Sequence, residues 1–541
     1  MSNNICLHGS HNGAIAFNID NNFYVIEAER FLGYKNSGFC QYKSIPCPDV
    51  AIKQILELID RRFNIKEFDK CITSYTHSVT VENGQNKYMK YEQAIPCKEY
   101  ITHLTHHQLH AYSTFYQSPH ENNIIISFDG GGDDGFFNIY LWSKDMESPE
   151  LLEQHPYDLG SSYMAFGHYL DAIKLENDLS EGNLVYSGKL MGLCGYGTVI
   201  KEWIPFFEEY YKVNTNLGTP VEDRMKKLGM NIGINFDTND RLKDKIAYDV
   251  AATSQYVFEK ITIDCINNVI NKYDDSYAIC MTGGCALNVL LNTSIKKRYN
   301  KRVFVSPNSN DCGIALGGLF YACKPDRPVN IIYGGMQCFD IDSIGSYSYE
   351  RSYNHDILYD PSIEQIAKLL CNGRIIGVIR GNAEHGPRAL GNRSILCDPT
   401  YADMKNILNA KVKHREWYRP FAPVVQYEKS NKYFDILEDS PYMSFAFDVR
   451  SEFRQKLSPI THIDGTARVQ TLRRETNIWL YDLLEHVEKI NGFPILLNTS
   501  FNINGKPIVS TIQEAFYILD NTDLDGVLAN NTLIIKRKNS E

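Results

Sequence analysis

The stretch NIIISFDGGGDDG, residues 123–135, determines the fold class. A run of β-branched and apolar residues stops abruptly at an aspartate and three glycines, as a buried strand does where it enters a tight turn. The same pattern returns in YAICMTGGCALN, residues 277–288, and in RVFVSPNSNDCGIALGG, residues 302–318, and both continue into helix-like sequence. In α/β proteins, ligands bind at the carboxyl ends of such strands. The sequence therefore predicts an α/β fold whose site lies where these strands end.

The length of the chain and a change in its pattern predict two domains. At 541 residues the chain is too long for one ordinary hydrophobic core. The stretch FDIDSIGSYSYERSYNHD, residues 339–356, is polar, rich in Ser and Tyr and without helical periodicity, which is typical of a linker. A second α/β pattern follows it. We therefore predict a first domain at 1–345, a linker at 346–360 and a second domain at 361–541.

Composition argues against several classes of protein. Lys and Arg contribute 55 charges against 65 from Asp and Glu, and the net charge of −10 is not that of a general polyanion binder. The 14 cysteines form no CxxC pair and the opening MSNNICLHGS has no secretory signal, so buried reduced thiols are the simplest interpretation. The least polar stretch, GIALGGLFYAC at 313–323, is far shorter than the ~18 residues of a membrane span. We expect a soluble, cytoplasmic protein with no membrane partner.

Two histidines and two aspartates are candidate metal ligands. In HHQLH, His106 and His110 are four residues apart and share one face if the segment is helical. The zincin protease signature HExxH needs a Glu, which HHQLH lacks, and Gln108 cannot act as a base, so that class is excluded. Taken alone, such a pair is more often packed core than a site, but Asp129 and Asp311 follow buried strands and would complete a mixed N/O set. That set suits Fe(II), Mn(II) or Zn(II).

A glycine pair and a lysine are candidate nucleotide contacts. Gly283 and Gly284 end a strand in MTGGCALN, where a nucleotide could lie against the backbone. Lys189 in SGKLMGL could serve a phosphate as a point charge, although a solvated surface lysine is the more common case.

The downstream half carries a basic excess inside an acidic chain. Arginines lie in GPRALGNRS (386–394) and KHREWYRPFAP (413–423), next to glycines and prolines that hold loops in place. DGTARVQ adds Arg468, and NTSFN adds Ser500 and Asn502 after an apolar strand. Such a cluster predicts a site for a specific small anion.

These motifs, taken in order, resemble one family. HNGA, HHxxH, GKxMGL, GGxALN, GPRALGNRSIL, KxREWxRPFAP, HxDGTARVQT and NTSFN resemble the O-carbamoyltransferases of nodulation-factor and antibiotic tailoring, over essentially the whole chain. The resemblance implies an actin/sugar-kinase-like ATPase-fold N-terminal domain and a YrdC-like α/β C-terminal domain. It also implies that the second domain makes carbamoyl-adenylate from carbamoyl phosphate and ATP, and that the first transfers the carbamoyl group to an acceptor hydroxyl.

The resemblance assigns roles residue by residue. The co-substrates would be ATP and carbamoyl phosphate, with Fe(II) or a similar divalent metal and with Mg. His11 would be the general base, and the remaining residues fall into three groups: metal ligands His106, His110, Asp129 and Asp311; nucleotide contacts Lys189, Gly283, Gly284 and Asn288; and carbamoyl-phosphate contacts Arg388, Lys413, Arg419, Arg468, Ser500 and Asn502.

The chain departs from the family pattern at a few positions, and these leave the acceptor open. Asn12 stands where the family commonly has Asp, and GLCGYG at 192–197 replaces a proline-containing motif. The acceptor could be a sugar, a natural product, a saccharide precursor or a hydroxymethylpyrimidine of a nucleotide or of DNA. The oligomeric state is open as well. Two other functions compete: an ATP-dependent small-molecule kinase of the same fold, and a non-catalytic nucleotide sensor.

Overall fold

The computed structural model describes residues 2–39, 48–74, 81–82, 85–86, 95–174, 182–213 and 220–537. The chain divides into two compact units, Met1–Ile331 and Ile332–Glu541.

This boundary lies earlier than the sequence placed it, at 345. The backbone N–H of Ala383 donates to the carbonyl of Met336 (3.0 Å), which joins the start of the second unit to that unit's own loops. Residues 346–360, expected as a linker, include most of α12 (Ile344–Arg351) and all of β13 (His355–Tyr359). The sequence of α12 shows no helical periodicity of apolar residues, because the residue that this helix buries is Ser348 and not an aliphatic side chain.

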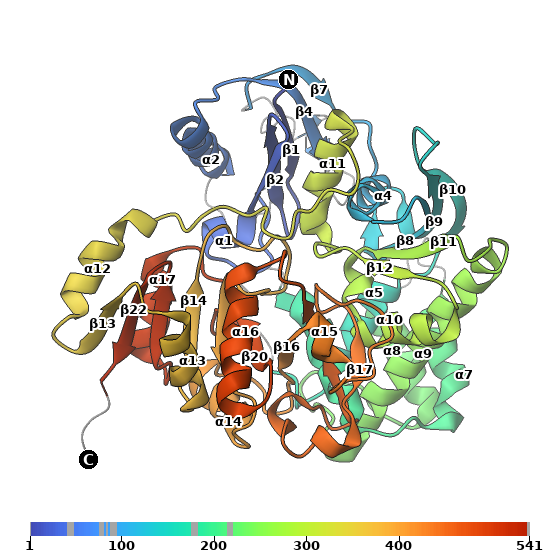
Figure 1. Cartoon of the computed structure of the whole chain (residues 1–541). Helices are drawn as coiled ribbons and strands as arrows, with labels where there is room; N and C mark the ends of the chain where they lie inside the picture. Colours follow the sequence, from blue (N-terminus) through green and yellow to red (C-terminus); the bar gives the residue numbers. More distant parts are fainter. Residues whose placement is uncertain are drawn as a thin grey trace. The chain divides into compact units, whose positions relative to one another are not determined.

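The first unit contains two five-stranded sheets with the same strand order (Figure 1). In the first sheet the order is β3 (Asn22–Glu27), β2 (Ala14–Ile19), β1 (Asn4–His8), β4 (Phe68–Ser74), β7 (Cys97–Ile101). In the second it is β10 (Glu150–His155), β9 (Gly135–Ser143), β8 (Asn122–Gly132), β11 (Tyr277–Thr282), β12 (Val303–Val305). In each sheet, the three strands that come first in the sequence form an antiparallel meander. The two strands that follow them in the sequence run parallel to the first strand of that meander. This duplicated topology is that of the actin/sugar-kinase-like fold, and the predicted α/β class is confirmed.

Helices surround both sheets, and two of them bring the site together. Helix α4 (His106–Gln117) packs on β8, β9 and β11, and α11 (Ile314–Cys323) packs on β1, β2, β4 and on α4. The other helices of this unit are α1 (Ala28–Leu32), α2 (Pro48–Phe63), α5 (Leu159–Ala165), α6 (Tyr186–Leu193), α7 (Ile204–Tyr211), α8 (Val221–Ile232), α9 (Asp244–Ile270) and α10 (Val289–Arg298). A two-stranded ribbon joins β5 (Val81–Glu82) to β6 (Gln85–Asn86).

The second unit is a mixed eight-stranded sheet with helices packed on it. The strand order is β13, β22 (Thr532–Lys536), β21 (Gly526–Ala529), β14 (Ile376–Ile379), β15 (Arg393–Cys397), β20 (Ile495–Ser500), β16 (Ala422–Gln426), β19 (Gln470–Leu472). A separate pair is formed by β17 (Ala446–Asp448) and β18 (Thr466–Arg468). Besides α12, the helices are α13 (Ile363–Cys371), α14 (Met404–Ile407), α15 (Tyr427–Ser430), α16 (Ile478–Asn491) and α17 (Ile512–Asn521). Aliphatic residues of α13, α16 and the sheet form one buried cluster, which is the core of this unit.

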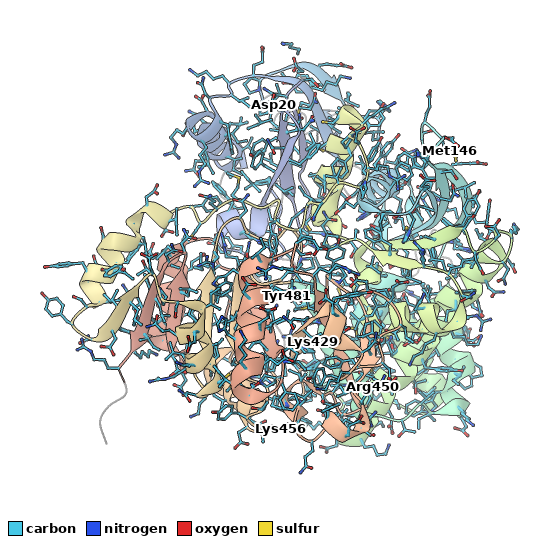
Figure 2. The ribbon with its side chains drawn as sticks, in the orientation of Figure 1. Asp20, Met146, Lys429, Arg450, Lys456 and Tyr481 are labelled. Carbon is cyan, nitrogen blue, oxygen red and sulfur yellow. The ribbon has the colours of Figure 1, made fainter. Side chains whose placement is uncertain are left out.

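Some basic residues of the second unit are exposed and can serve as controls for the basic residues of its interior. Arg450 and Lys456, labelled in Figure 2, are exposed on the connection between β17 and β18. In the part of the chain that the structure describes, no helix is long and apolar enough to cross a membrane.

Candidate functional site

The first site is built at the end of β8. Residues 123–129 of this strand are buried, since α4 and α5 both pack on it, and Asp129 follows the last apolar residue. The Oδ1 atom of Asp129 accepts a hydrogen bond from the backbone N–H of Gly131 (2.8 Å), which holds the turn. A Cβ on Gly132 would lie 2.5 Å from the ring of His106. The glycines therefore let the strand turn and let the His106 ring approach.

The next two aspartates of this turn cap α4. The backbone N–H groups of His106 and His107 donate to Asp133 Oδ1 (2.8 Å) and Asp134 Oδ1 (3.0 Å). The backbone N–H of Thr105 also donates to Gln108 Oε1 (3.3 Å), so the glutamine that excluded a protease is part of the helix cap. Carboxylates at a helix N-terminus satisfy its open N–H groups and its dipole.

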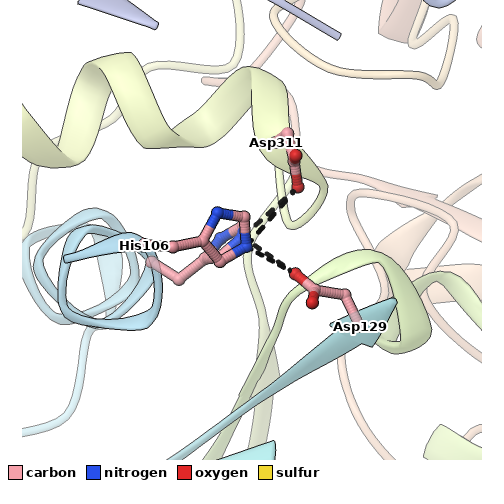
Figure 3. A group of neighbouring side chains, drawn as sticks. His106, Asp129 and Asp311 are labelled. Atoms are coloured by element: carbon pink, nitrogen blue, oxygen red, sulfur yellow. Dashed lines mark hydrogen bonds and ion pairs between the residues drawn. The ribbon is translucent and has the colours of Figure 1, made fainter. Parts of the chain in front are cut away.

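The four predicted metal ligands lie together in the interior of the unit. Helix α4 brings His106 and His110, β8 brings Asp129, and Asp311 lies in the short turn before α11. Figure 3 shows His106, Asp129 and Asp311 pointing toward one another. One ligand atom from each lies within 4.8 Å of the others, and all four residues are buried. The Nε2 of His106 is 2.8 Å from Asp129 Oδ2, and the Nε2 of His110 is 3.5 Å from both Asp129 Oδ2 and Asp311 Oδ1.

The electrostatics of this cluster fit a bound cation. Burial lowers the pKa of His106, but the charges of Asp129 and Asp311 outweigh burial and raise that pKa to about 10. Burial raises the pKa of Asp311, but the surrounding histidines hold it well below its usual value. Among the described residues, His110 Nε2 has no hydrogen-bond partner. Two buried carboxylates and an orphaned imidazole nitrogen form the donor set that a divalent metal accepts.

Asp311 has a second face. Its Oδ1 points to His110, whereas its Oδ2 lies 3.3 Å from Nδ1 of His11 and 3.8 Å from Nε2 of His8. The His11 side chain is 22% exposed, so it can meet a substrate, and the His8 side chain is fully buried. Burial lowers the pKa of His8, and Asp311 opposes this only in part. The predicted base therefore lies beside a predicted metal ligand.

The glycine pair lies beside Asp129. Gly283 has φ +86, and a Cβ there would lie 2.2 Å from the carbonyl oxygen of Phe128, so no other residue fits between the two strands. A Cβ on Gly284 would lie 3.7 Å from the Cβ of Asp129. A ligand against this backbone would therefore also face the metal cluster.

Asn288 and Lys189, the other two residues predicted to contact a nucleotide, already form hydrogen bonds within the protein. Asn288 caps α10 by accepting from the N–H of Leu291 (3.0 Å), and its Nδ2 donates to Gln255 Oε1 (2.9 Å). Lys189 on α6 is buried, and its Nζ donates to the carbonyl of Lys174 (2.7 Å). Their contacts with a nucleotide stay predictions.

The second unit gathers arginines at close quarters. Burial, together with the charge of Arg419, lowers the pKa of Arg388 to about 10. Burial also takes the pKa of Arg468 well below its usual value, with added repulsion from Arg388 and Arg419. Burial also holds the pKa of Arg415 well below its usual value, with added repulsion from Arg419 and Arg468. Within the described ranges, Arg468 Nε has no hydrogen-bond partner. Like charges held together inside a protein favour an anionic ligand between them.

Hydrogen bonds join Lys413 to Ser500 and Asn502, so this lysine is paired with protein oxygens. The Nζ of Lys413 lies 2.7 Å from the carbonyl oxygens of Ser500 and Asn502, and 3.2 Å from Ser500 Oγ. The Oγ of Ser500 donates to Asn502 Oδ1 (2.6 Å). Lys413 therefore holds the 500–502 turn, and its direct contact with an anion stays a prediction.

A buried glutamate shapes the loop that carries Arg388. The Oε1 atom of Glu384 accepts from the backbone N–H groups of Leu390 (2.7 Å), Asn392 (2.8 Å) and Arg393 (3.2 Å). The Asn498 amide donates to the carbonyl of Ala389 (3.1 Å) in the same loop. Arg393, in the same motif, donates to backbone carbonyls, for example that of Asn392 (2.8 Å), and so helps to hold the loop.

The sequence did not assign His8 or Glu384 to a site. It placed Arg415 in a basic motif but not among the carbamoyl-phosphate contacts. His8 stands three residues before His11 at the end of a strand, and that spacing was the available signal. Glu384 stands two residues before the GPRALGNRS motif, and an acidic residue beside a basic loop was the signal there. Neither is identified without knowing that the side chain is buried.

Comparison with known proteins identifies the family of the chain. Two family models match: Carbamoyltransferase N-terminus over residues 65–320 and Carbamoyltransferase C-terminus over residues 367–536. Nodulation protein NolO of Bradyrhizobium diazoefficiens is 33% identical over 456 residues, which are 80% of this chain and 79% of that protein. Nodulation protein NolNO of Sinorhizobium fredii is 30% identical over 466 residues, 81% of this chain and 64% of that protein. Nodulation protein U of Rhizobium tropici is 28% identical over 464 residues, 81% of this chain and 76% of that protein.

Similar solved structures are more distant. HypF of T. kodakarensis is 14% identical, with a TM-score of 0.31, and the match covers 60% of this chain and 48% of HypF. A glucokinase from an Antarctic psychrotroph is 13% identical, with a TM-score of 0.31, and the match covers 60% of this chain and 98% of the glucokinase. The fold assignment accordingly stands on the strand order. Since both family models match and together span most of the chain, the protein belongs to the carbamoyltransferase family and is a carbamoyltransferase.

Proposed function

We propose that the protein is an ATP-dependent O-carbamoyltransferase that uses carbamoyl phosphate and works through a carbamoyl-adenylate intermediate. The observation that carries the proposal is the pair of opposite centres, a His/Asp cluster with two buried carboxylates in the first unit and an arginine cluster in the second. Two buried carboxylates suit a cation, whereas an arginine cluster suits an anion, so the two centres suit different steps of one reaction.

The arginine cluster suits carbamoyl phosphate. Guanidinium groups bind a phosphate dianion through paired charge-assisted hydrogen bonds, which also orient it. In the proposed reaction water cleaves carbamoyl phosphate to carbamate and phosphate, and a carbamate oxygen then attacks the α-phosphate of ATP, with release of pyrophosphate. Arg388, Arg419 and Arg468 would hold the phosphate, while Glu384 and Lys413 hold the loops around it.

The His/Asp cluster suits transfer to a hydroxyl. The Nδ1 of His11 faces Asp311 Oδ2, so its Nε2 is the atom that would take the proton from the acceptor hydroxyl. The hydroxyl oxygen then bonds to the carbamoyl carbon, and AMP leaves. A divalent metal held by His106, His110, Asp129 and Asp311 would supply positive charge for the phosphate of the leaving AMP.

The proposed acceptor is a compound with a free hydroxyl group, and several classes of compound meet this requirement. A sugar, a natural product and a hydroxymethylpyrimidine, free or in DNA, all present the same hydroxyl to His11. The proposed setting is the cytoplasm, where ATP and carbamoyl phosphate are made. A kinase of the same fold is the competing function, but it would leave the arginine cluster of the second unit without a ligand.

Product analysis separates the two. The protein is incubated with ATP and ¹⁴C-labelled carbamoyl phosphate, first alone and then with a panel of hydroxyl acceptors. We expect pyrophosphate and AMP, and a labelled acceptor in the panel. ADP with transfer of the γ-phosphate, and no dependence on carbamoyl phosphate, would instead identify a kinase.

A further inference from the structure

We propose that His8 is a positioning residue of the metal centre, which holds Asp311 by its outer oxygen. The inference rests on the metal site of the proposed function and adds a residue that is not one of the four ligands.

His8 is a buried imidazole that the rest of the fold does not use. It is the last residue of β1, and its side chain is completely buried. In the described part of the chain, neither Nδ1 nor Nε2 has a hydrogen-bond partner. A buried polar group without a partner costs about 1–3 kcal/mol, so an apolar residue would suit this position better for stability alone. The placement therefore indicates a role beyond packing.

The atom that Nε2 faces is Asp311 Oδ2, at 3.8 Å. The other oxygen, Oδ1, faces His110 at 3.5 Å and belongs to the ligand cluster. The distance to Oδ2 is longer than a hydrogen bond, so a small shift of either side chain closes the pair. Carboxylates that bind a metal with one oxygen are usually held by a donor on the other, and loss of that donor typically weakens metal binding 10- to 100-fold.

His11 also lies beside Asp311 Oδ2, so an Asp311 side chain that is held in place also orients His11. Its Nδ1 is 3.3 Å from Oδ2, on the exposed side of the carboxylate. With His8 on the buried side, the carboxylate plane has one orientation, and His11 is aimed by it. His8 thus acts through Asp311 on both the metal and the base, and it does not touch the acceptor.

Three variants test this in the full-length protein. His8→Phe keeps an aromatic ring and removes the donor. His8→Gln keeps a donor near the position of Nε2. His355→Asn is the matched control, because within the described ranges both nitrogens of His355 also lack hydrogen-bond partners, but this residue lies in the second unit. The affinity for Co(II) is measured by chelator competition, the visible absorption of Co(II) at saturation reports the ligand set, and thermal unfolding is followed with and without metal.

We expect His8→Phe to bind Co(II) 10- to 100-fold more weakly, with an unchanged spectrum at saturation and with no loss of metal-free stability. His8→Gln should recover most of the affinity, and His355→Asn should match the wild type. Unchanged affinity in His8→Phe overturns the inference while leaving the metal site intact. A changed spectrum also overturns it, because His8 would then be a ligand itself. If the wild type binds no metal, both the inference and the metal site of the proposed function fall.

Discussion

A single aspartate joins the metal ligands to the base. Asp311 presents Oδ1 to His110 and Oδ2 to His11, and its side chain is 4% exposed. Because each oxygen has its own neighbours, the cluster depends on every member holding a fixed position. The most direct consequence at this scale concerns metal content.

Replacing His110 by alanine removes one of the four candidate ligands of the cluster. We expect His110→Ala to purify with little or no bound divalent metal, whereas the wild type holds one ion per chain. The remaining buried carboxylates then lack a cation, so the variant should also melt at a lower temperature. His103→Ala, an exposed histidine near the start of α4, is the control. Equal metal content in wild type and His110→Ala contradicts the ligand assignment.

Residues with a positional signature could be predicted from the sequence, and residues defined by burial could not. The four-residue spacing of His106 and His110 predicted a shared helical face, and α4 confirms it. Glu384 has no such spacing to a partner, and the three-residue spacing of His8 from His11 does not show that His8 is buried. Their importance comes from being fully buried beside polar partners, and burial depends on segments far away in the chain.

At the scale of elements, the loop between β14 and β15 depends on Glu384. Three backbone N–H groups share its Oε1, so the carboxylate sets the path of the segment that carries Arg388. Glu384→Gln keeps the acceptor and loses the charge, which weakens each bond.

We expect Glu384→Gln to raise the KM for carbamoyl phosphate about tenfold or more, with a smaller change in kcat, while transfer from supplied carbamoyl-adenylate stays at the wild-type rate. Steady-state kinetics measure both, and the exposed Glu452→Gln is the control. An equal loss in both half-reactions would show that Glu384 supports only global stability.

The start of α5 predicts a pH effect on stability. Asp158 caps this helix by accepting from the N–H of Ser161 (2.8 Å), and burial raises its pKa to about 6. Because the folded pKa exceeds the unfolded value near 4, the unfolded chain releases its proton first as pH rises. Stability from this group is therefore complete below about pH 4 and is lost between about pH 4 and pH 6.

Asp158→Asn keeps the cap without the charge. We expect the variant to be more stable than the wild type at pH 7, by up to about 3 kcal/mol, and equal to it near pH 4. Urea unfolding at the two pH values measures the difference. The same gap at both pH values would contradict a buried carboxylate as its cause.

At the scale of the whole molecule, the sequence predicted two α/β units but not their boundary. Strand-and-turn patterns such as 123–135 are local, so they could be read directly. The segment 332–360 was misleading because α12 and β13 are stabilised by distant partners, such as the pairing of β13 with β22. Long-range pairing of this kind leaves no local period in the sequence.

The central claim is that the two units carry two separate half-reactions. Loss of Arg468 removes charge-assisted hydrogen bonds worth roughly 1.5–3 kcal/mol from a bound anion, so adenylate formation should fall at least tenfold to a hundredfold. His11→Asn leaves the arginine cluster untouched and should still consume ATP and carbamoyl phosphate while failing to modify the acceptor. Arg450→Ala, on an exposed loop of the same unit, is the control.

Supplying chemically made carbamoyl-adenylate to each variant is the most direct test. The account predicts that Arg468→Ala regains acceptor carbamoylation at the wild-type rate, whereas His11→Asn does not. Equal rescue of both variants, or normal adenylate formation by Arg468→Ala, would contradict the account and assign these residues to one shared site.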